Sequence, residues 1–321
     1  TRKSKFILLK VNSGKIWVMK KLILIDGYAI LYRAYFALPS LTNRFGEPIN
    51  AIYGLVSMFL RIIQDLSPSY IAVAFDTDKP TFRHKAYQQY QIQRPAKTPE
   101  FESQIERAVK IFQAFGVPIY SFEGYEADDV IATLAKQALD KTHPQIDEVI
   151  IITGDRDILQ LVNKRIKVYL PIIGLSKAKL MGINEVVEKL GVKPDQIPDY
   201  KALVGDASDN YHGVAGIGPK TTVDLLGRFK TLDNIYKNLD QISRKVSQKL
   251  EKGHESAKLS LKLATIVSDV PVSLDLVAAK AWKIDSQEVL DLFAEIGFKT
   301  LTQRVKEVGK RLSQEKQMSL I

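Results

Sequence analysis

Three apolar runs that each end at an aspartate constrain the fold of this chain more than any other feature. They are residues 21–25 before Asp26, residues 71–75 before Asp76, and residues 149–153 before Asp155 and Asp157. Strands that are apolar on both faces belong inside a parallel sheet that helices cover. Helix-like segments alternate with these runs at residues 51–65, 98–115 and 127–140. The alternation predicts an α/β fold, a mostly parallel sheet with helices on both faces.

The aspartates fall where such a sheet binds its ligands, outside the carboxyl ends of the strands. Glu126, Asp128 and Asp129 join them in the first turn of the next predicted helix. One such acid is an ordinary turn or capping residue. Carboxylates that converge on one crevice, however, repel each other unless cations compensate them. The set therefore predicts Mg²⁺ or Mn²⁺, two ions that clamp a phosphodiester for attack by water.

A second acidic pair, Asp206 and Asp209, precedes a glycine-rich turn. The turn contains Gly213, Gly216 and Gly218, and Lys220 follows at the start of a predicted helix. Exposed backbone N–H groups in such a turn bind phosphate, although a tight helix–helix connection has the same composition. Beside the acidic pair, the turn predicts a helix–turn–helix that holds duplex backbone without reading sequence.

Composition agrees with a nucleic-acid ligand. The net charge of +10 indicates a polyanionic partner. The chain has no cysteine and four histidines, so disulfides and thiolate metal sites are excluded and oxygen ligands are expected. Absence of cysteine also suits a cytoplasmic protein. No apolar run reaches the roughly 18–20 residues of a membrane span.

From about residue 20 to residue 300 the chain resembles the 5′ nuclease domain of bacterial DNA polymerase I and the wider flap endonuclease family. The motifs that carry the resemblance are residues 24–27, 32–34, 75–76, 81–84, 124–129, 153–157, 205–210 and 213–218. The resemblance implies a 5′-3′ exonuclease and flap endonuclease that cuts branched or flapped DNA, including RNA-primed 5′ ends, in replication and repair. It also implies two metal ions, a helix–three-turn–helix motif, and a potassium ion at turn 213–218.

The resemblance assigns roles to residues whose motifs match. The inner metal group comprises Asp26, Asp76, Glu126, Asp128 and Asp155. The remaining metal group comprises Asp129, Asp157, Asp206 and Asp209. The catalytic group comprises Asp26, Arg83, Glu126, Asp128 and Asp155. The DNA-binding group comprises Tyr32, Arg33, Tyr90, Arg94, Gly213, Gly216, Gly218 and Lys220.

The chain departs from the family pattern at two places. A helical arch over the 5′ strand is expected at residues 81–102, where Gln91 replaces the usual lysine. Loss of that cation predicts a slower enzyme, or one less able to cut without a well-placed substrate. Arg83 remains, and Lys85, Arg94 or Lys97 is expected to substitute in part. Tyr211 and His212 replace the usual leucine or isoleucine and proline before the glycine turn.

The predicted organisation has four parts: an upstream extension or cloning remnant at 1–18, a nuclease layer at 19–185, a helical duplex-binding region at 186–305, and a tail at 306–321. The last five residues, Gln317 to Ile321, resemble a sliding-clamp binding motif, and a frayed end is the alternative. We expect a monomer, either a stand-alone nuclease or an excised domain. Two other functions stay open, a PIN-type ribonuclease and a non-catalytic DNA junction binder.

Overall fold

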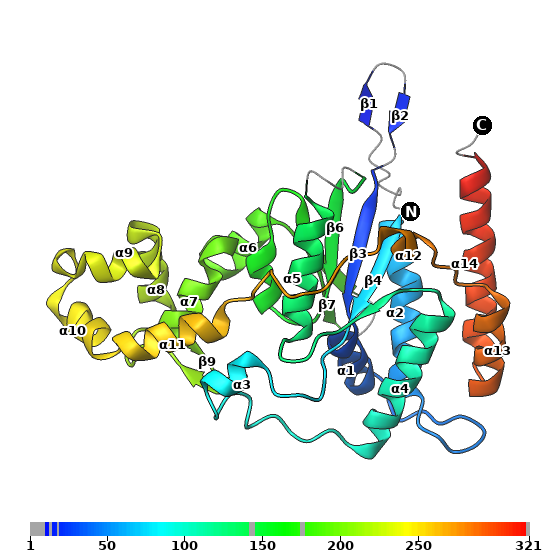
Figure 1. Ribbon diagram of the computed structural model, residues 1–321, viewed down its shortest axis with the longest axis horizontal. Coiled ribbons are helices and arrows are strands. Elements are labelled where there is room, and N and C mark those ends of the chain that lie inside the picture. The colour runs from blue at the N-terminus through cyan, green and yellow to red at the C-terminus, as the bar shows by residue number, and fades with distance from the viewer. Residues whose placement is uncertain (1–9, 13–14, 18, 141–144, 174–176, 319–321) are drawn as a thin grey trace.

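A six-stranded sheet lies at the centre of the computed structural model, which describes residues 10–12, 15–17, 19–140, 145–173 and 177–318 (Figure 1). The strand order is β5-β4-β3-β6-β7-β8. The strands are β3 Lys21–Asp26, β4 Tyr70–Ala74, β5 Ile119–Tyr120, β6 Glu148–Ile152, β7 Ile166–Ile173 and β8 Lys177–Met181. β8 runs antiparallel to β7, and the other neighbouring pairs are parallel. The predicted mostly parallel sheet is confirmed.

Side chains alternate along each strand, so the sheet supports a separate hydrophobic core on each face. On β3, Leu22 and Leu24 enter one core, while Ile23 and Ile25 enter the other. Helices α1 Gly27–Ala37, α2 Asn50–Leu66 and α4 Pro99–Ala114 contribute to the second core. Helix α5 Ala127–Ala138 contributes to the first. Burial on both faces explains why the strands are apolar throughout.

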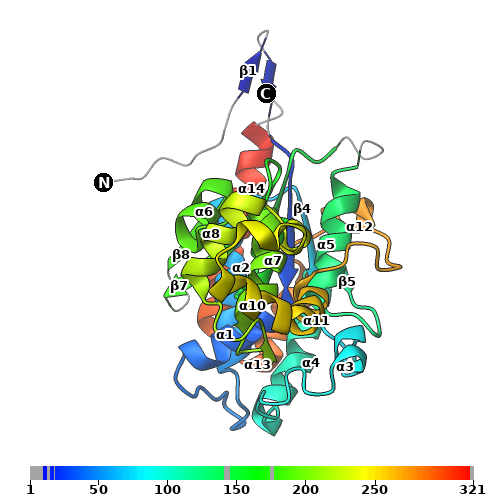
Figure 2. The same cartoon turned by 90° about the vertical axis from the view of Figure 1, so that its left-hand side faces the viewer.

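A helical region continues the first core beyond the sheet (Figure 1). Its elements are α6 Ile183–Leu190, α7 Ile197–Val204, β9 Gly205–Asp206, β10 Tyr211–His212, α8 Pro219–Phe229, α9 Leu232–Lys237, α10 Arg244–Lys252 and α11 His254–Ala264. Short strands β9 and β10 pair antiparallel and carry the predicted acidic pair at their turn. Figure 2 views the molecule from this side, with α8 and α10 in front of the sheet.

After α11 the chain returns to the nuclease layer. Residues 265–275 run along α5, where the Val270 amide donates to Thr133 Oγ1 at 3.1 Å and the Leu274 amide donates to Gln137 Oε1 at 2.8 Å. Helices α12 Leu276–Lys280, α13 Gln287–Ile296 and α14 Lys299–Met318 follow. α13 and α14 pack on the α2 side of the sheet, on the far side from α8 (Figure 1).

The C-terminal boundaries therefore differ from the predicted ones. Residues from α13 onward belong to the nuclease layer, and α14 continues through the predicted boundary at residue 305. The reason is a helical apolar spacing, Leu301, Val305 and Val308, whose side chains are buried in the second core. Much of the predicted tail is thus helical. Within the clamp-like motif, residues 319–321 lie outside the described residues.

Within the predicted extension, β1 Lys10–Asn12 pairs with β2 Lys15–Trp17. Residues 1–9, 13–14 and 18 lie outside the described part. Among the described helices, none has the length and apolar character to cross a membrane.

The predicted helical arch is helical only at its two ends. Helix α3 Phe82–Ala86 opens it and the first turn of α4 closes it, while residues 87–98, here called the strap, form turns and extended chain. Gln91 adopts a left-handed φ of 56°, which a continuing right-handed helix excludes. Pro95 further disfavours a helical residue 94.

Candidate active site

Asp26 and Asp76 lie at the carboxyl edge of the sheet, as predicted. The Asp26 carboxylate caps α1 by accepting from the Ala29 amide at 2.9 Å, and it also accepts from Thr153 Oγ1 at 2.8 Å. Asp76 accepts from the Ala127 amide at 2.8 Å, which ties the end of β4 to the start of α5. Burial, and then the charge of Asp76, raise the pKa of Asp26 to about 7.

Glu126, Asp128 and Asp155 face the same region. Burial raises the pKa of Glu126 to about 7. Burial, followed by the charges of Asp155 and Asp26, holds the pKa of Asp128 well above its usual value. Asp155 is oriented by the Asp157 amide, which donates to its Oδ1 at 2.8 Å. Mutual repulsion among partly buried carboxylates is the condition that a hard divalent cation compensates, so the donor set fits Mg²⁺ or Mn²⁺.

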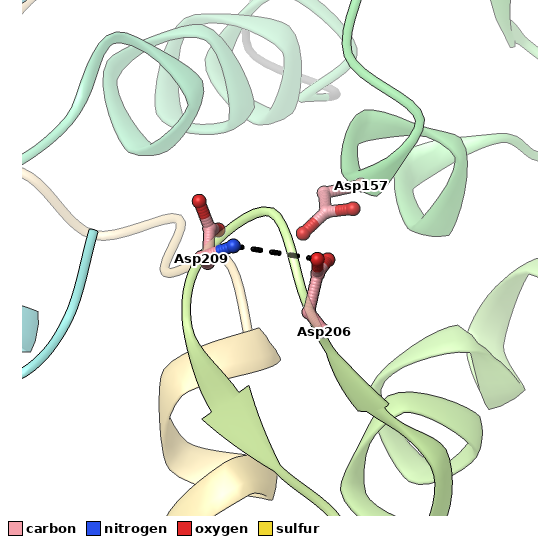
Figure 3. Close-up of side chains that lie close together, drawn as sticks. All are labelled: Asp157, Asp206 and Asp209. Carbon is pink, nitrogen blue, oxygen red and sulfur yellow. Dashed lines mark hydrogen bonds between the residues drawn. The ribbon is translucent and has the colours of Figure 1, made fainter. Parts of the chain in front are cut away.

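A second acidic group, Asp157, Asp206 and Asp209, is more closely spaced than the inner group of Asp26, Asp76, Glu126, Asp128 and Asp155. Oxygens of Asp157, Asp206 and Asp209 all lie within 4.8 Å of one another (Figure 3). Among the residues that the structure describes, this is the one acidic group that meets that distance. The inner group is brought to the same edge of the sheet but is more widely spaced.

Lys201, which the sequence analysis missed, holds the second group together. Its ammonium group pairs with Asp157 Oδ1 and Asp206 Oδ2. Burial opposes the charge of Lys201, but the two carboxylates keep its pKa above the usual value. Burial would raise the pKa of Asp206, and Lys201 and Ser208 bring it below the usual value. The one sequence signal was a lysine in the last turn of the helix that delivers Asp206.

Asp129 is occupied by partners other than a metal. Its side chain is fully buried, and it binds both Arg83 guanidinium nitrogens, at 2.7 and 2.9 Å. The amides of Glu126 and Val267 also donate to it. With both oxygens taken, its geometry does not fit the predicted metal ligand. It is a structural acid at the start of α5.

Arg83 is likewise placed away from the predicted catalytic role. It is 2% exposed, pairs with Glu126 at 3.2 Å besides Asp129, and donates to the carbonyls of Leu263 and Thr265. These bonds join the base of the strap to α5 and to the end of α11. A guanidinium held on all sides has no free edge for a phosphate.

The strap is bound to Asp209. Tyr90 donates to Asp209 Oδ2 at 3.1 Å, Gln91 Nε2 donates to Oδ1 at 3.1 Å, and Arg94 pairs with Oδ1 at 2.7 Å. Tyr90 is 4% exposed, so it does not present a ring for the predicted DNA contact. Arg94 is half exposed and retains access to a substrate.

The three turn glycines have different roles. A side chain at Gly213 would lie 2.2 Å from the Leu203 carbonyl oxygen, so this glycine permits close packing on α7. Gly216 adopts a φ of 76°, and its carbonyl accepts from the Lys249 ammonium at 2.9 Å. Gly218 and Lys220 are exposed at the start of α8, the position that the phosphate prediction requires.

An aromatic surface on α1 contains the other predicted DNA contacts. Tyr32 is 41% exposed and its ring stacks on Tyr28, with centroids 6.1 Å apart. Phe36, on the same helix, is 67% exposed and lies against Tyr32. Arg33 is partly buried on this helix, and burial lowers its pKa. Exposed rings beside cations suit unpaired bases.

Two family models match consecutive parts of the chain. The first, 5′-3′ exonuclease, N-terminal resolvase-like domain, matches residues 21–191, and the second, 5′-3′ exonuclease, C-terminal SAM fold, matches residues 192–287. A DNA polymerase I of Caldicellulosiruptor bescii is 42% identical over 287 residues, which cover 89% of this chain and 33% of that protein. The chain thus spans about a third of the length of such relatives.

A 5′-3′ exonuclease of Aquifex aeolicus is 36% identical over 302 residues, covering 94% of this chain and 100% of that protein. Among solved structures, a complex of bacteriophage T5 flap endonuclease with DNA and metal ions has a TM-score of 0.62 at 21% identity. That likeness covers 90% of this chain and 98% of the other. At this identity the likeness concerns the fold.

Proposed function

We propose, from the premise that the chain belongs to the 5′-3′ exonuclease family, that it hydrolyses DNA phosphodiester bonds at junctions of single and double strands. The observation that carries the proposal is the convergence of two acidic groups at one edge of the sheet. Strand ends supply Asp26, Asp76 and Asp155, and the β9–β10 turn supplies Asp206 and Asp209. A basic chain that gathers its acids this way suits a metal-dependent phosphodiesterase.

The cofactor that we propose is a pair of Mg²⁺ or Mn²⁺ ions. Asp26, Asp76, Glu126, Asp128 and Asp155 would hold one, and Asp157, Asp206 and Asp209 the other, in competition with the Lys201 ammonium that now pairs with Asp157 and Asp206. When bound, such ions supply an acidified water and compensate the charge of the phosphate. Support comes from the T5 flap endonuclease, which was solved as a complex with DNA and metal ions, and from the oxygen-only donor set.

The chain's own residues orient these donors. Thr153 bonds both Asp26 and the Asp155 amide, which fixes the ends of β3 and β6 relative to each other. The Arg83–Asp129 pair fixes the first turn of α5, from which Glu126 and Asp128 project. Rigid supports of this kind set the catalytic geometry before substrate arrives.

For the substrate, we propose branched or flapped DNA, RNA-primed 5′ ends included. Exposed Tyr32 would stack an unpaired base, Arg33 and Arg94 would contact backbone near the strap, and Lys220 with the Gly218 turn would hold a duplex phosphate. A potassium ion at turn 213–218 would have to compete with the Lys249 ammonium on the Gly216 carbonyl.

We retain three further proposals from the sequence: a monomeric enzyme, a clamp contact through residues 317–321, and a cytoplasmic location beside DNA. Deleting residues 317–321 tests the clamp contact. Abolished clamp binding would support the contact, and unchanged binding would rule it out. Analytical ultracentrifugation, which measures the mass in solution, tests the monomeric state.

The decisive experiment is Mg²⁺-dependent cleavage of a 5′-labelled flap, compared with an intact duplex and a single strand. Wild type should cut at the junction, and Asp155→Asn should bind the flap without cutting it. Wild-type binding without cleavage would favour the junction binder. Preference for single-stranded RNA would favour the PIN-type ribonuclease, although the match to the C-terminal SAM-fold model argues against it.

A further inference from the structure

Tyr211 carries a buried hydroxyl that the protein does not satisfy. The residue is 3% exposed, and among the described residues no group forms a hydrogen bond with its hydroxyl. It begins β10 and pairs in register with Asp206 on β9. A buried hydroxyl without a partner lowers stability, so such groups call for a specific explanation.

The surroundings of this hydroxyl are acidic. After burial, the charges of Asp157, Asp206 and Asp209 are the largest influences on the pKa of Tyr211, and all of them raise it. A tyrosine hydroxyl can both donate and accept a hydrogen bond. That of Tyr211, on the strand residue paired with Asp206, bonds to no oxygen of the second acidic group.

The neighbouring Tyr90 shows that a buried tyrosine hydroxyl can form a hydrogen bond to the second acidic group. The two rings stack with centroids 6.5 Å apart and planes at 20°, yet the Tyr90 hydroxyl donates to Asp209 at 3.1 Å. Burial against Tyr90 would be served equally by an apolar side chain, which can neither donate nor accept, so the hydroxyl needs its own role.

We propose that Tyr211 is a positioning residue whose hydroxyl accepts a hydrogen bond from a water on a divalent cation held by Asp157, Asp206 and Asp209. The inference rests on the two-ion function proposed above. Mg²⁺ keeps several of its waters when a few carboxylates bind it, and those waters need acceptors. A buried hydroxyl on the residue paired with Asp206, without a direct partner, is suited to a contact through water.

Mn²⁺ binding without DNA, followed by calorimetry, tests this role with Tyr211→Phe. We expect the weaker of two Mn²⁺ affinities to fall about three- to tenfold, and the other to stay unchanged. Without metal, in EDTA, the melting temperature should stay equal or rise, because the lost hydroxyl has no partner. Tyr211→Leu, the usual aliphatic residue, should show the same change in Mn²⁺ affinity.

Tyr70→Phe is the matched control. Tyr70 is 2% exposed at the opposite edge of the sheet, and its hydroxyl donates to Gln145 at 3.1 Å. This variant should lose stability equally with and without Mn²⁺ and keep both affinities. Flap cleavage adds a second readout: Tyr211→Phe should be slower at low Mg²⁺ and approach the wild-type rate at saturating Mg²⁺.

Two failures are distinguishable. If wild type cuts flaps and binds two ions while Tyr211→Phe binds them with equal affinity, the role of Tyr211 is overturned and the proposed function stands. If wild type binds one ion or none, the two-ion function itself is overturned, and this inference falls with it.

Discussion

Arg83 and Asp129 form a buried two-pronged ion pair, with nitrogen–oxygen distances of 2.7 and 2.9 Å. The pair borders the inner acidic group, since Arg83 also contacts Glu126 at 3.2 Å, and it joins α3 at the base of the strap to the first turn of α5. Two residues that the sequence motifs assign to catalysis or metal binding thereby support Glu126 and Asp128, which are proposed to bind metal.

Asp129→Asn should therefore act on folding. Arg83 would then be buried with Glu126 as its remaining carboxylate partner, and the loss of the two-pronged pair is expected to lower the free energy of unfolding by about 3 kcal/mol, measured by urea denaturation in EDTA. Asp76→Asn is the contrasting variant, since it should abolish cleavage and leave stability equal or higher by relieving repulsion. Wild-type stability of Asp129→Asn combined with lost cleavage would return Asp129 to the metal group.

Lys201→Met should make the protein depend on divalent metal for stability. Without the ammonium, Asp157 and Asp206 face each other with no compensating charge. We expect a loss of about 2–4 kcal/mol at pH 8 in EDTA, largely restored by Mg²⁺. Lys230→Met, in which an exposed lysine is replaced, is the control. An equal loss with and without Mg²⁺ would show that Lys201 acts through packing alone.

Stability in EDTA should fall as pH rises. Asp26 and Glu126 have pKa values raised to about 7 in the folded protein, so between pH 4 and 7 the folded state binds more protons than the unfolded state. Their stabilisation is present at low pH and is lost as the pH rises through 7, by several kcal/mol in total. Melting curves at pH 5 and pH 8 measure this loss.

Mg²⁺ should reverse that trend at pH 8, because ionised carboxylates bind the cation and the bound state is stabilised. Asp26→Asn should flatten the pH dependence in EDTA. Stability that rises between pH 5 and 8 in EDTA would contradict the repulsion described for the inner group.

Gln91→Lys should raise the single-turnover cleavage rate by about tenfold, since a cation beside the scissile phosphate stabilises developing charge. Gln91 now donates to Asp209, which a lysine at that place would also reach. Gln93→Lys, two residues away, is the control for added charge. An unchanged rate in Gln91→Lys would mean that Arg94, already at 2.7 Å from Asp209, compensates for the missing lysine.

Sequence patterns predicted the features that depend on local periodicity. Asp26, Asp76 and Asp155 follow apolar strands, so their meeting at one edge follows from parallel topology. The bonds of Lys201 and Arg83 were not predictable, because each joins elements far apart in the chain and depends on how α7 and α3 dock. The strap was expected to be helical by resemblance, but the left-handed backbone of Gln91 interrupts it.

The return of the chain along α5 has a further consequence. The helical region is tethered to the nuclease layer twice, through α6–α7 on the way out and through residues 265–275 on the way back. The hydrogen bonds to Thr133 and Gln137 fasten the return crossing along α5, so rotation of the helical region would have to break them. For the proposed nuclease, this fastening would hold the Gly218 turn at a set distance from the acidic edge. That distance would count nucleotides from the held duplex to the cut, so that the scission point is set by the protein's dimensions and not by base identity.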